Sequence, residues 1–184
     1  SPNMDIKKLS NTLYIFTIKR LIEIAGIVIS CLGILLFISL ISHTPEDPNF
    51  IFPDNIKIKN MMGFRGSYIS DFFFQSMGLI AYLIPLTFIL NGISIFHKKK
   101  LFLLIESTFF IICYSLVGSL FFSFFYNDGY SLYINGNGGF VGNYLNLTFL
   151  NNLINFNKNM IYYFLILLIL TLFLISINFN PKNF

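Results

Sequence analysis

Three polar residues stand inside long apolar stretches of this chain: Glu23, Asn91 and Glu106. Charged and strongly polar side chains are costly inside a bilayer, and those that occur there commonly mark a path for ions or protons. If these three side chains lined a water-filled cavity, they could serve a small membrane transporter or channel subunit. That is one interpretation of their types and positions.

The same residues also have a structural interpretation. Glu23 follows Lys19 by four residues and Arg20 by three, so on a helix they share one face and could form an ion pair at the membrane edge. Asn91 and Glu106 lie equally far from the middle of the short segment between their two apolar runs. This symmetry predicts a hydrogen bond between them across a helical hairpin.

Other residue patterns that perform chemistry are absent from the sequence. It contains no His-Glu-x-x-His, no Cys-x-x-Cys and no Gly-x-x-x-x-Gly-Lys-Ser/Thr motif. Its two histidines, His43 and His97, stand far apart, and Cys31 and Cys113 fall inside apolar runs, where we expect packing residues. We therefore predict no catalytic residue, no cofactor-binding residue and no metal ligand in this chain.

The composition indicates a membrane protein. Only 11% of the residues are charged and 55% are hydrophobic, whereas about 25% of the residues of a soluble domain are charged. Four apolar runs are each close to the roughly 20 residues that a membrane-crossing helix needs. They cover residues 21–41, 72–96, 101–125 and 160–177. We predict an all-α, four-span transmembrane helical bundle.

The basic residues predict how this bundle is oriented, because Lys and Arg are enriched in cytoplasmic segments. Eight of the twelve flank the spans on one side: Lys7, Lys8, Lys19, Arg20, Lys98, Lys99, Lys100 and Lys182. The two long loops contain the other four. We therefore expect both termini in the cytoplasm, with residues 1–20 as an N-terminal segment, 21–177 as the membrane domain and 178–184 as the start of a linker.

The first outer loop contains two turn signals. Pro45, Asp47 and Pro48 directly follow the first span, and the two prolines stop a helix because each lacks a backbone donor and restricts the preceding residue. Asp47 can accept hydrogen bonds from nearby backbone N–H groups. In the second turn, Gly63 and Gly66 allow left-handed backbone or a close approach of two segments.

The second outer loop contains Gly136, Gly138, Gly139 and Gly142, which interrupt regular structure. A set of apolar residues then recurs at roughly helical spacing, with asparagines between: Phe140, Val141, Tyr144, Leu145, Phe149, Leu153 and Phe156. This pattern predicts one amphipathic helix that lies on the outer membrane surface before the fourth span.

Two features of the second span concern packing. Pro85 removes a backbone donor and predicts a kink within the helix. Gly78 is expected at the same depth as Gly118 and Ser119 of the third span, where small residues let two helices approach closely.

In this order, the motifs resemble the N-terminal four-span domain of the FtsK-type DNA translocases, over about residues 19–177. The resemblance rests on Arg20-Leu21-x-Glu23, Ser42-x-x-Pro45-x-Asp47-Pro48, Asn60, Gly63-x-x-Gly66, Asp71, Gly78, Ala81-Tyr82-x-x-Pro85 and Gly138-Gly139-x-x-Gly142. The sequence departs from the family where Ser67 replaces a common Ala, and where Phe50 and Tyr68 replace frequent Trp residues.

The resemblance implies a multi-pass anchor in the bacterial inner membrane at the division septum, with the lipid bilayer and other septum proteins as partners. In this family, ATP, Mg, DNA and assembly into a hexamer belong to a cytoplasmic motor that supports chromosome partition. This chain contains no such motor. We therefore expect it to be the membrane part of a longer or split protein, and to form any homo-oligomer through the motor.

Two further expectations can be compared with a structure. The three outward motifs should meet at the outer surface, with Asp47 close to the loop at Gly138. The alternatives to the anchor are a transporter or channel subunit that uses Glu23, Asn91 and Glu106, and a four-span protein that shares only the turn motifs.

Overall fold

A computed structural model describes residues 2–47, 57–127 and 135–180, and the described part of the chain contains helices and no strand. The elements are α1 (Pro2–Ile41), α2 (Gly63–Met77), the 3-10 helix η1 (Gly78–Tyr82), α3 (Leu83–Lys98), α4 (Phe102–Phe125), α5 (Gly139–Asn146), α6 (Leu150–Phe156) and α7 (Lys158–Ser176). Within these residues, four helical stretches are long and apolar enough to cross a membrane: Asp5–Ile41, Gly63–Lys98, Phe102–Phe125 and Lys158–Ser176. The predicted all-α, four-span fold is confirmed.

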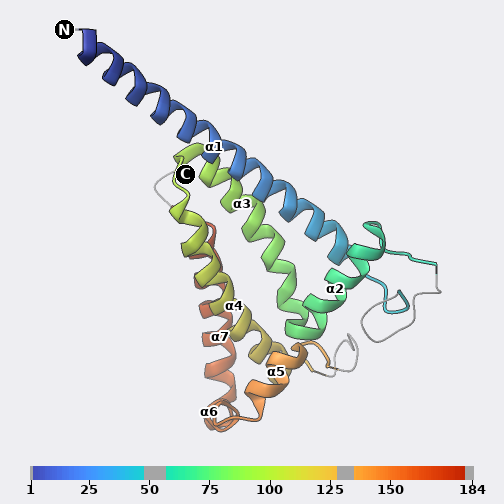
Figure 1. The fold of residues 1–184 in the computed structure, drawn as a ribbon. Coiled ribbons are helices and arrows are strands. Elements are labelled where there is room, and N and C mark those ends of the chain that lie inside the picture. The colour runs from blue at the N-terminus through green and yellow to red at the C-terminus, as the bar shows by residue number, and fades with distance from the viewer. Residues whose placement is uncertain (1, 48–56, 128–134, 181–184) are drawn as a thin grey trace.

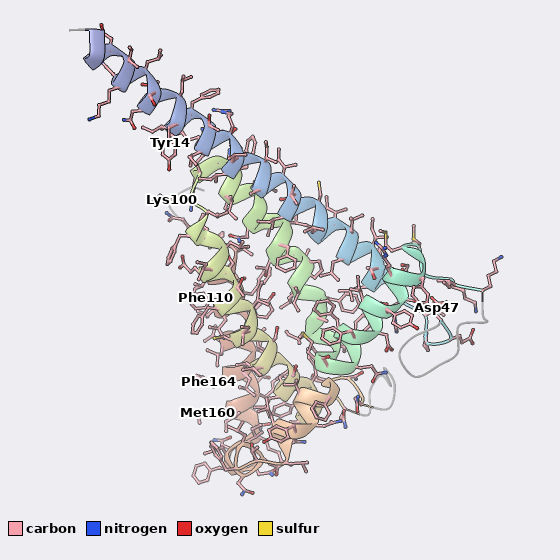
Figure 2. All side chains as sticks on the ribbon, in the orientation of Figure 1. Tyr14, Asp47, Lys100, Phe110, Met160 and Phe164 are labelled. Carbon is pink, nitrogen blue, oxygen red and sulfur yellow. The ribbon has the colours of Figure 1, made fainter. Side chains whose placement is uncertain are left out.

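The spanning helices associate as two pairs, α1 with α3 and α4 with α7 (Figure 1). The shorter helices α2, α5 and α6 lie toward one end of the bundle, and both ends of the chain lie toward the other. Figure 2 shows Lys100 toward the end that holds the termini and Asp47 at the opposite end. We call the end with α2 and α5 the outer end, because the distribution of basic residues predicts that the other end faces the cytoplasm.

The α1–α3 pair forms around small residues. A Cβ on Gly26 would lie 2.6 Å from the carbonyl oxygen of Gly92, so the two backbones are nearly in contact there. The Ser30 hydroxyl donates a 2.9 Å hydrogen bond to the carbonyl oxygen of Ile89. Small residues permit such close approach in a membrane, where dispersion contacts and interhelical hydrogen bonds drive association. The pairing of α1 with α3 therefore depends on glycine and serine residues at the contact.

An apolar cluster joins the two pairs. Its buried members come from η1, α3, α4, α6 and α7: Ile80, Ile84, Tyr114, Leu120, Phe121, Ile154, Leu165 and Ile169. Because these residues lie between the pairs, each pair buries part of its apolar surface against the other. A second, smaller buried cluster contains Leu40, Phe74 and Ala81. Many other apolar side chains of the four spans are exposed, as expected for a surface that faces lipid.

The predicted kink at Pro85 is wrong in position. The second span breaks earlier, at η1, where Gly78 has a φ of +71°. Pro85 lies in the first turn of α3, where the missing N–H of proline has no helical acceptor to lose. The break tilts α2 away from α3 and lays it across the outer end of the bundle (Figure 1).

The predicted amphipathic helix is present as two short helices, α5 and α6, separated by Leu147–Phe149. Several large apolar side chains of α5 and α6 are exposed, including Phe140 at 64% and Phe156 at 90%. Such exposure is typical of side chains that insert into the interfacial region of a bilayer. The glycines of α5 face inward instead, where Gly139 and Gly142 are buried.

Candidate functional site at the outer end of the bundle

Most of the outer-loop residues of the family resemblance gather in two polar clusters at the ends of α2. We call the first the exit junction; it contains Asp47, which follows α1, and Asn60, which precedes α2. The buried Asp47 carboxylate accepts hydrogen bonds from the backbone N–H groups of Lys59, at 2.6 Å, and Asn60, at 2.8 Å. The turn after α1 is thereby tied to the segment that leads into α2. Pro48 lies outside the described residues, and the exposed Pro45 precedes the tie.

Asn60 extends the exit junction from the loop to α1. Its amide nitrogen donates to the carbonyl oxygen of Ser39, at 2.9 Å, and its amide oxygen accepts from the backbone N–H of Met62, at 3.0 Å. The side chain of Asn60 is only 5% exposed. A Cβ on Gly66 would lie 2.4 Å from the Asn60 amide oxygen, and the Ser39 hydroxyl donates to the Gly66 carbonyl oxygen at 2.7 Å. Gly66 is therefore required for the close approach of α1, Asn60 and α2.

His43 closes the exit junction on the α2 side. Its Nδ1 lies 2.8 Å from the hydroxyl oxygen of Ser70, and its ring packs against Phe74 with 4.8 Å between ring centroids. Burial lowers the pKa of His43 to about 4, and the nearby Asp47 carboxylate opposes this shift only in part. His43 is therefore neutral at physiological pH. Directly after Ser70 on α2, the buried Asp71 forms a side-chain hydrogen bond with Gln75.

The low pKa of His43 predicts a specific pH dependence. An unfolded His titrates near 6.5, so between about pH 6.5 and 4 the unfolded chain binds more protons than the folded chain, and stability falls as the pH falls through this window. We expect the thermal unfolding midpoint in detergent to decrease more between pH 7.5 and 4.5 for the natural chain than for His43→Gln. Equal decreases would show that His43 does not titrate in this way.

The second cluster, the glycine junction, joins the end of α2 to the loop before α5. The backbone N–H of Leu79 donates to the carbonyl oxygen of Asn137, at 2.9 Å, and the amide nitrogen of Asn137 donates to the carbonyl oxygen of Tyr126, at 2.6 Å. A Cβ on Gly78 would lie 1.8 Å from the Asn137 carbonyl oxygen, and one on Gly139 would lie 2.6 Å from the backbone nitrogen of Met77.

Helix α4 forms the other wall of the glycine junction. A Cβ on Gly138 or Gly142 would lie 2.5 or 2.3 Å from the carbonyl oxygen of Ser119. The hydroxyl of Ser119 donates to the carbonyl oxygen of Met77, at 3.0 Å, and Gly118 packs against Ile80. The predicted close approach of the second and third spans at this depth is confirmed.

The prediction that all three outward motifs meet is correct for the first two and wrong for the third. Asp47 and Gly66 share the exit junction, whereas Gly138 contacts α4 and Gly139 contacts the last residues of α2. Gly78 follows Gly66 by twelve positions in the second span, about 18 Å along a helix. The motifs thus form two junctions joined by α2, which the sequence motifs alone do not reveal.

The ion pair predicted for Glu23 is present with one additional partner. Glu23 Oε2 lies 2.6 Å from Arg20 Nη1, and Glu23 Oε1 lies 3.1 Å from Lys99 Nζ. Lys99 reaches α1 because it ends α3 in the left-handed region, with φ +56°. The carboxylate therefore ties α1 to the α3–α4 turn. Lys19, the other predicted partner, forms no ion pair within the described residues.

Replacing Glu23 with Gln should destabilise the chain by about 1 kcal/mol, because Glu23 is buried while its two cationic partners are partly exposed to water. Chemical unfolding in detergent would measure the change. Glu46→Gln is the matched control, since its ion pair with Lys59 is fully exposed and should contribute close to nothing. An equal cost for both variants would contradict the role assigned to Glu23.

The predicted hydrogen bond between Asn91 and Glu106 is wrong. The Asn91 amide oxygen accepts from the side chain of Asn178, at 2.9 Å, and its amide nitrogen has no partner. Glu106 forms no hydrogen bond or ion pair within the described residues and is partly exposed. The symmetry argument assumed that the second and third spans pack along their whole lengths, but α3 lies on α1 instead.

A buried hydroxyl network was missed by the sequence reasoning. Thr87 Oγ1 lies 2.9 Å from the Tyr114 hydroxyl and 3.1 Å from the Ser176 hydroxyl, and Ser107 donates to the Ser176 carbonyl oxygen at 2.6 Å. The network links α3, α4 and α7 inside the bundle. Its signal in the sequence is weak, because Ser and Thr are common in membrane helices and usually bond to their own helix.

The arrangement at the outer end holds helices together and offers no reactive constellation. Across the part of the chain that the structure describes, no three His, Cys, Asp or Glu side chains gather as metal ligands. The polar groups of the two junctions bond mainly to backbone atoms of neighbouring segments. What the junctions determine is the position of α2 and α5 above the spans.

Comparison with known proteins agrees with this architecture. The protein-family model described as the 4TM region of DNA translocase FtsK/SpoIIIE matches residues 18–181 of this chain. The chain belongs to this family. Both junctions and all four spans lie within the matched range.

Individual FtsK relatives match over less than half of the chain. DNA translocase FtsK of Rickettsia typhi is 31% identical over 77 residues, which are 42% of this chain and 10% of the relative. The FtsK of Azospirillum brasilense is 33% identical over 87 residues, which are 46% of this chain and 14% of the relative. The FtsK of Pseudomonas putida is 31% identical over 81 residues, which are 44% of this chain and 10% of the relative. The chain thus matches only about a tenth of these FtsK proteins. No solved structure matches it significantly.

Proposed function

We propose that this FtsK-family chain is the membrane anchor of a septal DNA translocase. It would hold an ATP-driven, DNA-pumping motor at the inner membrane of the division septum and support cell division and chromosome partition. The motor would lie in a cytoplasmic part of the protein outside this chain or on a separate chain. In this proposal ATP, Mg and DNA contact the motor, and the membrane region contacts lipid and other septum proteins.

The observation that most supports the proposal is the match of residues 18–181 to the membrane region of a DNA translocase family. The arrangement of the chain agrees with an anchor, because both ends lie toward the basic end of the bundle (Figure 1). A chain that leaves the membrane on the cytoplasmic side can carry a motor that acts on DNA there.

The contacts of the intramembrane polar residues give no support to a transporter. Glu23 is neutralised by Arg20 and Lys99, and Asn91 bonds to Asn178. The Glu106 side chain forms no hydrogen bond or ion pair within the described residues, so no contact joins it to Glu23 or Asn91. We therefore propose no transport function.

Imaging tests the proposed location. A fluorescent protein fused after residue 184 should concentrate at midcell in dividing bacteria. Two membranes lie side by side at the septum, so any membrane protein gives a stronger signal there. A control fusion to an unrelated four-span protein measures this background. Uniform membrane fluorescence, or midcell enrichment no greater than that of the control, would contradict the proposal.

A further inference from the structure

A pocket opens at the cytoplasmic end of the bundle, between the last two turns of α3 and the residues that follow α7. Its volume is about 380 Å³. The half that lies deeper in the membrane is lined by Leu90, Ile93 and Ile177, and the half nearer the surface by Ser94, Lys98 and Asn178. Helix α3 runs toward the cytoplasmic surface. The lining of the pocket therefore changes from apolar to polar toward that surface, as the membrane does from its acyl chains to its headgroups.

The cation at the mouth of this pocket is not neutralised by the protein. Lys98 forms no ion pair within the described residues, whereas its neighbour Lys99 is paired with Glu23. Glu23 in turn is already shared between Lys99 and Arg20. A positive charge therefore stands at the membrane surface beside an apolar cavity.

A second, independent feature lies beside the pocket. The side chain of Asn91 is fully buried, and its amide nitrogen has no hydrogen-bond partner. Its amide oxygen holds Asn178, which lines the pocket and has a left-handed φ of +56°. Asn91 itself does not line the pocket, but its hydrogen bond fixes the position of Asn178 in the pocket wall.

We propose that this pocket binds one anionic phospholipid of the cytoplasmic leaflet. The upper part of an acyl chain would lie against Leu90 and Ile93, and the headgroup phosphate would lie at Lys98 and Asn178. Basic pockets between membrane helices on the cytoplasmic side are suited to anionic lipids, because the positive charge attracts the headgroup while the apolar wall contacts the acyl chain. The proposal goes beyond anchoring, since it gives the domain a preference for a lipid class.

Native mass spectrometry of the purified chain tests the headgroup contact. In detergent with added lipid, we expect one phosphatidylglycerol to be retained more strongly than phosphatidylethanolamine. Lys98→Gln should weaken retention about five-fold, as expected for one lysine at a membrane surface. The matched control is Lys100→Gln, which removes an exposed charge from the same turn without changing the pocket. Equal losses in the two variants, or equal retention of the two lipids, would overturn the proposal.

A second pair of variants tests the apolar half independently of charge. Ile93 is 46% exposed, so Ile93→Trp can fill the pocket without unfolding the chain, and it should displace phosphatidylglycerol. Ile105→Trp places the same side chain on α4, also near the cytoplasmic end, and should leave retention unchanged. Retention of phosphatidylglycerol by Ile93→Trp at the level of the natural chain would overturn the proposal.

Discussion

Replacing Gly78 with Ala is expected to be the most damaging single substitution in this domain. The new Cβ would lie 1.8 Å from the carbonyl oxygen of Asn137, which belongs to the backbone and cannot rotate away. The alanine would also have to adopt a φ of +71°, a region that disfavours side chains. We expect a loss of more than about 3 kcal/mol, or failure to accumulate in the membrane, because the glycine junction must open to make room.

Gly63→Ala is the matched control for this prediction. Gly63 has the same φ of +71°, but nothing lies within 4 Å of its virtual Cβ. Only backbone strain remains, so the expected cost is about 1 kcal/mol. Membrane levels and unfolding midpoints of the two variants in detergent would measure the difference. If both variants lost equal stability, backbone strain alone would explain the loss and the contact with Asn137 would be irrelevant.

Replacing Asn60 with Ala should have the second-largest effect. The substitution leaves the buried carbonyl oxygen of Ser39 and the backbone N–H of Met62 without their side-chain partner. An unsatisfied buried polar group costs about 1–3 kcal/mol, so we expect a loss of about 2–4 kcal/mol in chemical unfolding. The exit junction would then hold α2 only through its remaining bonds, such as those of Ser39 with Gly66 and His43 with Ser70.

Asn155→Ala controls for the removal of an asparagine as such. Asn155 is exposed and bonds only to the side chain of Asn151 within the described residues. Its loss should change the free energy of unfolding by less than about 0.5 kcal/mol. A cost for Asn60→Ala no larger than that of Asn155→Ala would show that the exit junction does not stabilise the domain.

Much of the fold could be predicted from the sequence because a bilayer leaves few choices. Each apolar run must form a helix that satisfies its own backbone, so four runs give four spans. The lysines of the 98–100 turn then predict which end of the bundle faces the cytoplasm. The glycines of the outer loops indicated tight turns and close approach, and Gly66, Gly138 and Gly142 are all positions where a Cβ would collide with a neighbour.

The pairing of the helices could not be predicted in the same way. Spans that follow each other in sequence are natural partners, and this assumption led to the incorrect bond between Asn91 and Glu106. In the structure, α3 packs on α1 because Gly26 and Gly92 allow their backbones to touch. Glycines are frequent in membrane helices, so these two gave no signal that distinguished them from the others.

The arrangement of the two junctions at the outer end could be predicted only in part as well. The turn residues at Asp47 and Gly138 were recognisable, but the break at Gly78 decides how far apart they lie. A glycine inside an apolar run fits either a continuous helix or a turn, and Pro85, seven residues later, was the stronger local signal for a kink. The contact of Gly78 with Asn137, a residue of the next outer loop, settles the choice.

The central claim, that this domain anchors a translocase motor at the septum, can be tested by domain replacement. In Pseudomonas putida, residues 1–184 of this chain would replace the corresponding membrane region of the FtsK relative, with a fluorescent protein on the motor. We predict that the motor concentrates at midcell, and that the Gly78→Ala version fails to position it. A motor that is spread evenly along the membrane, while the replaced protein is intact and membrane-bound, would contradict the claim.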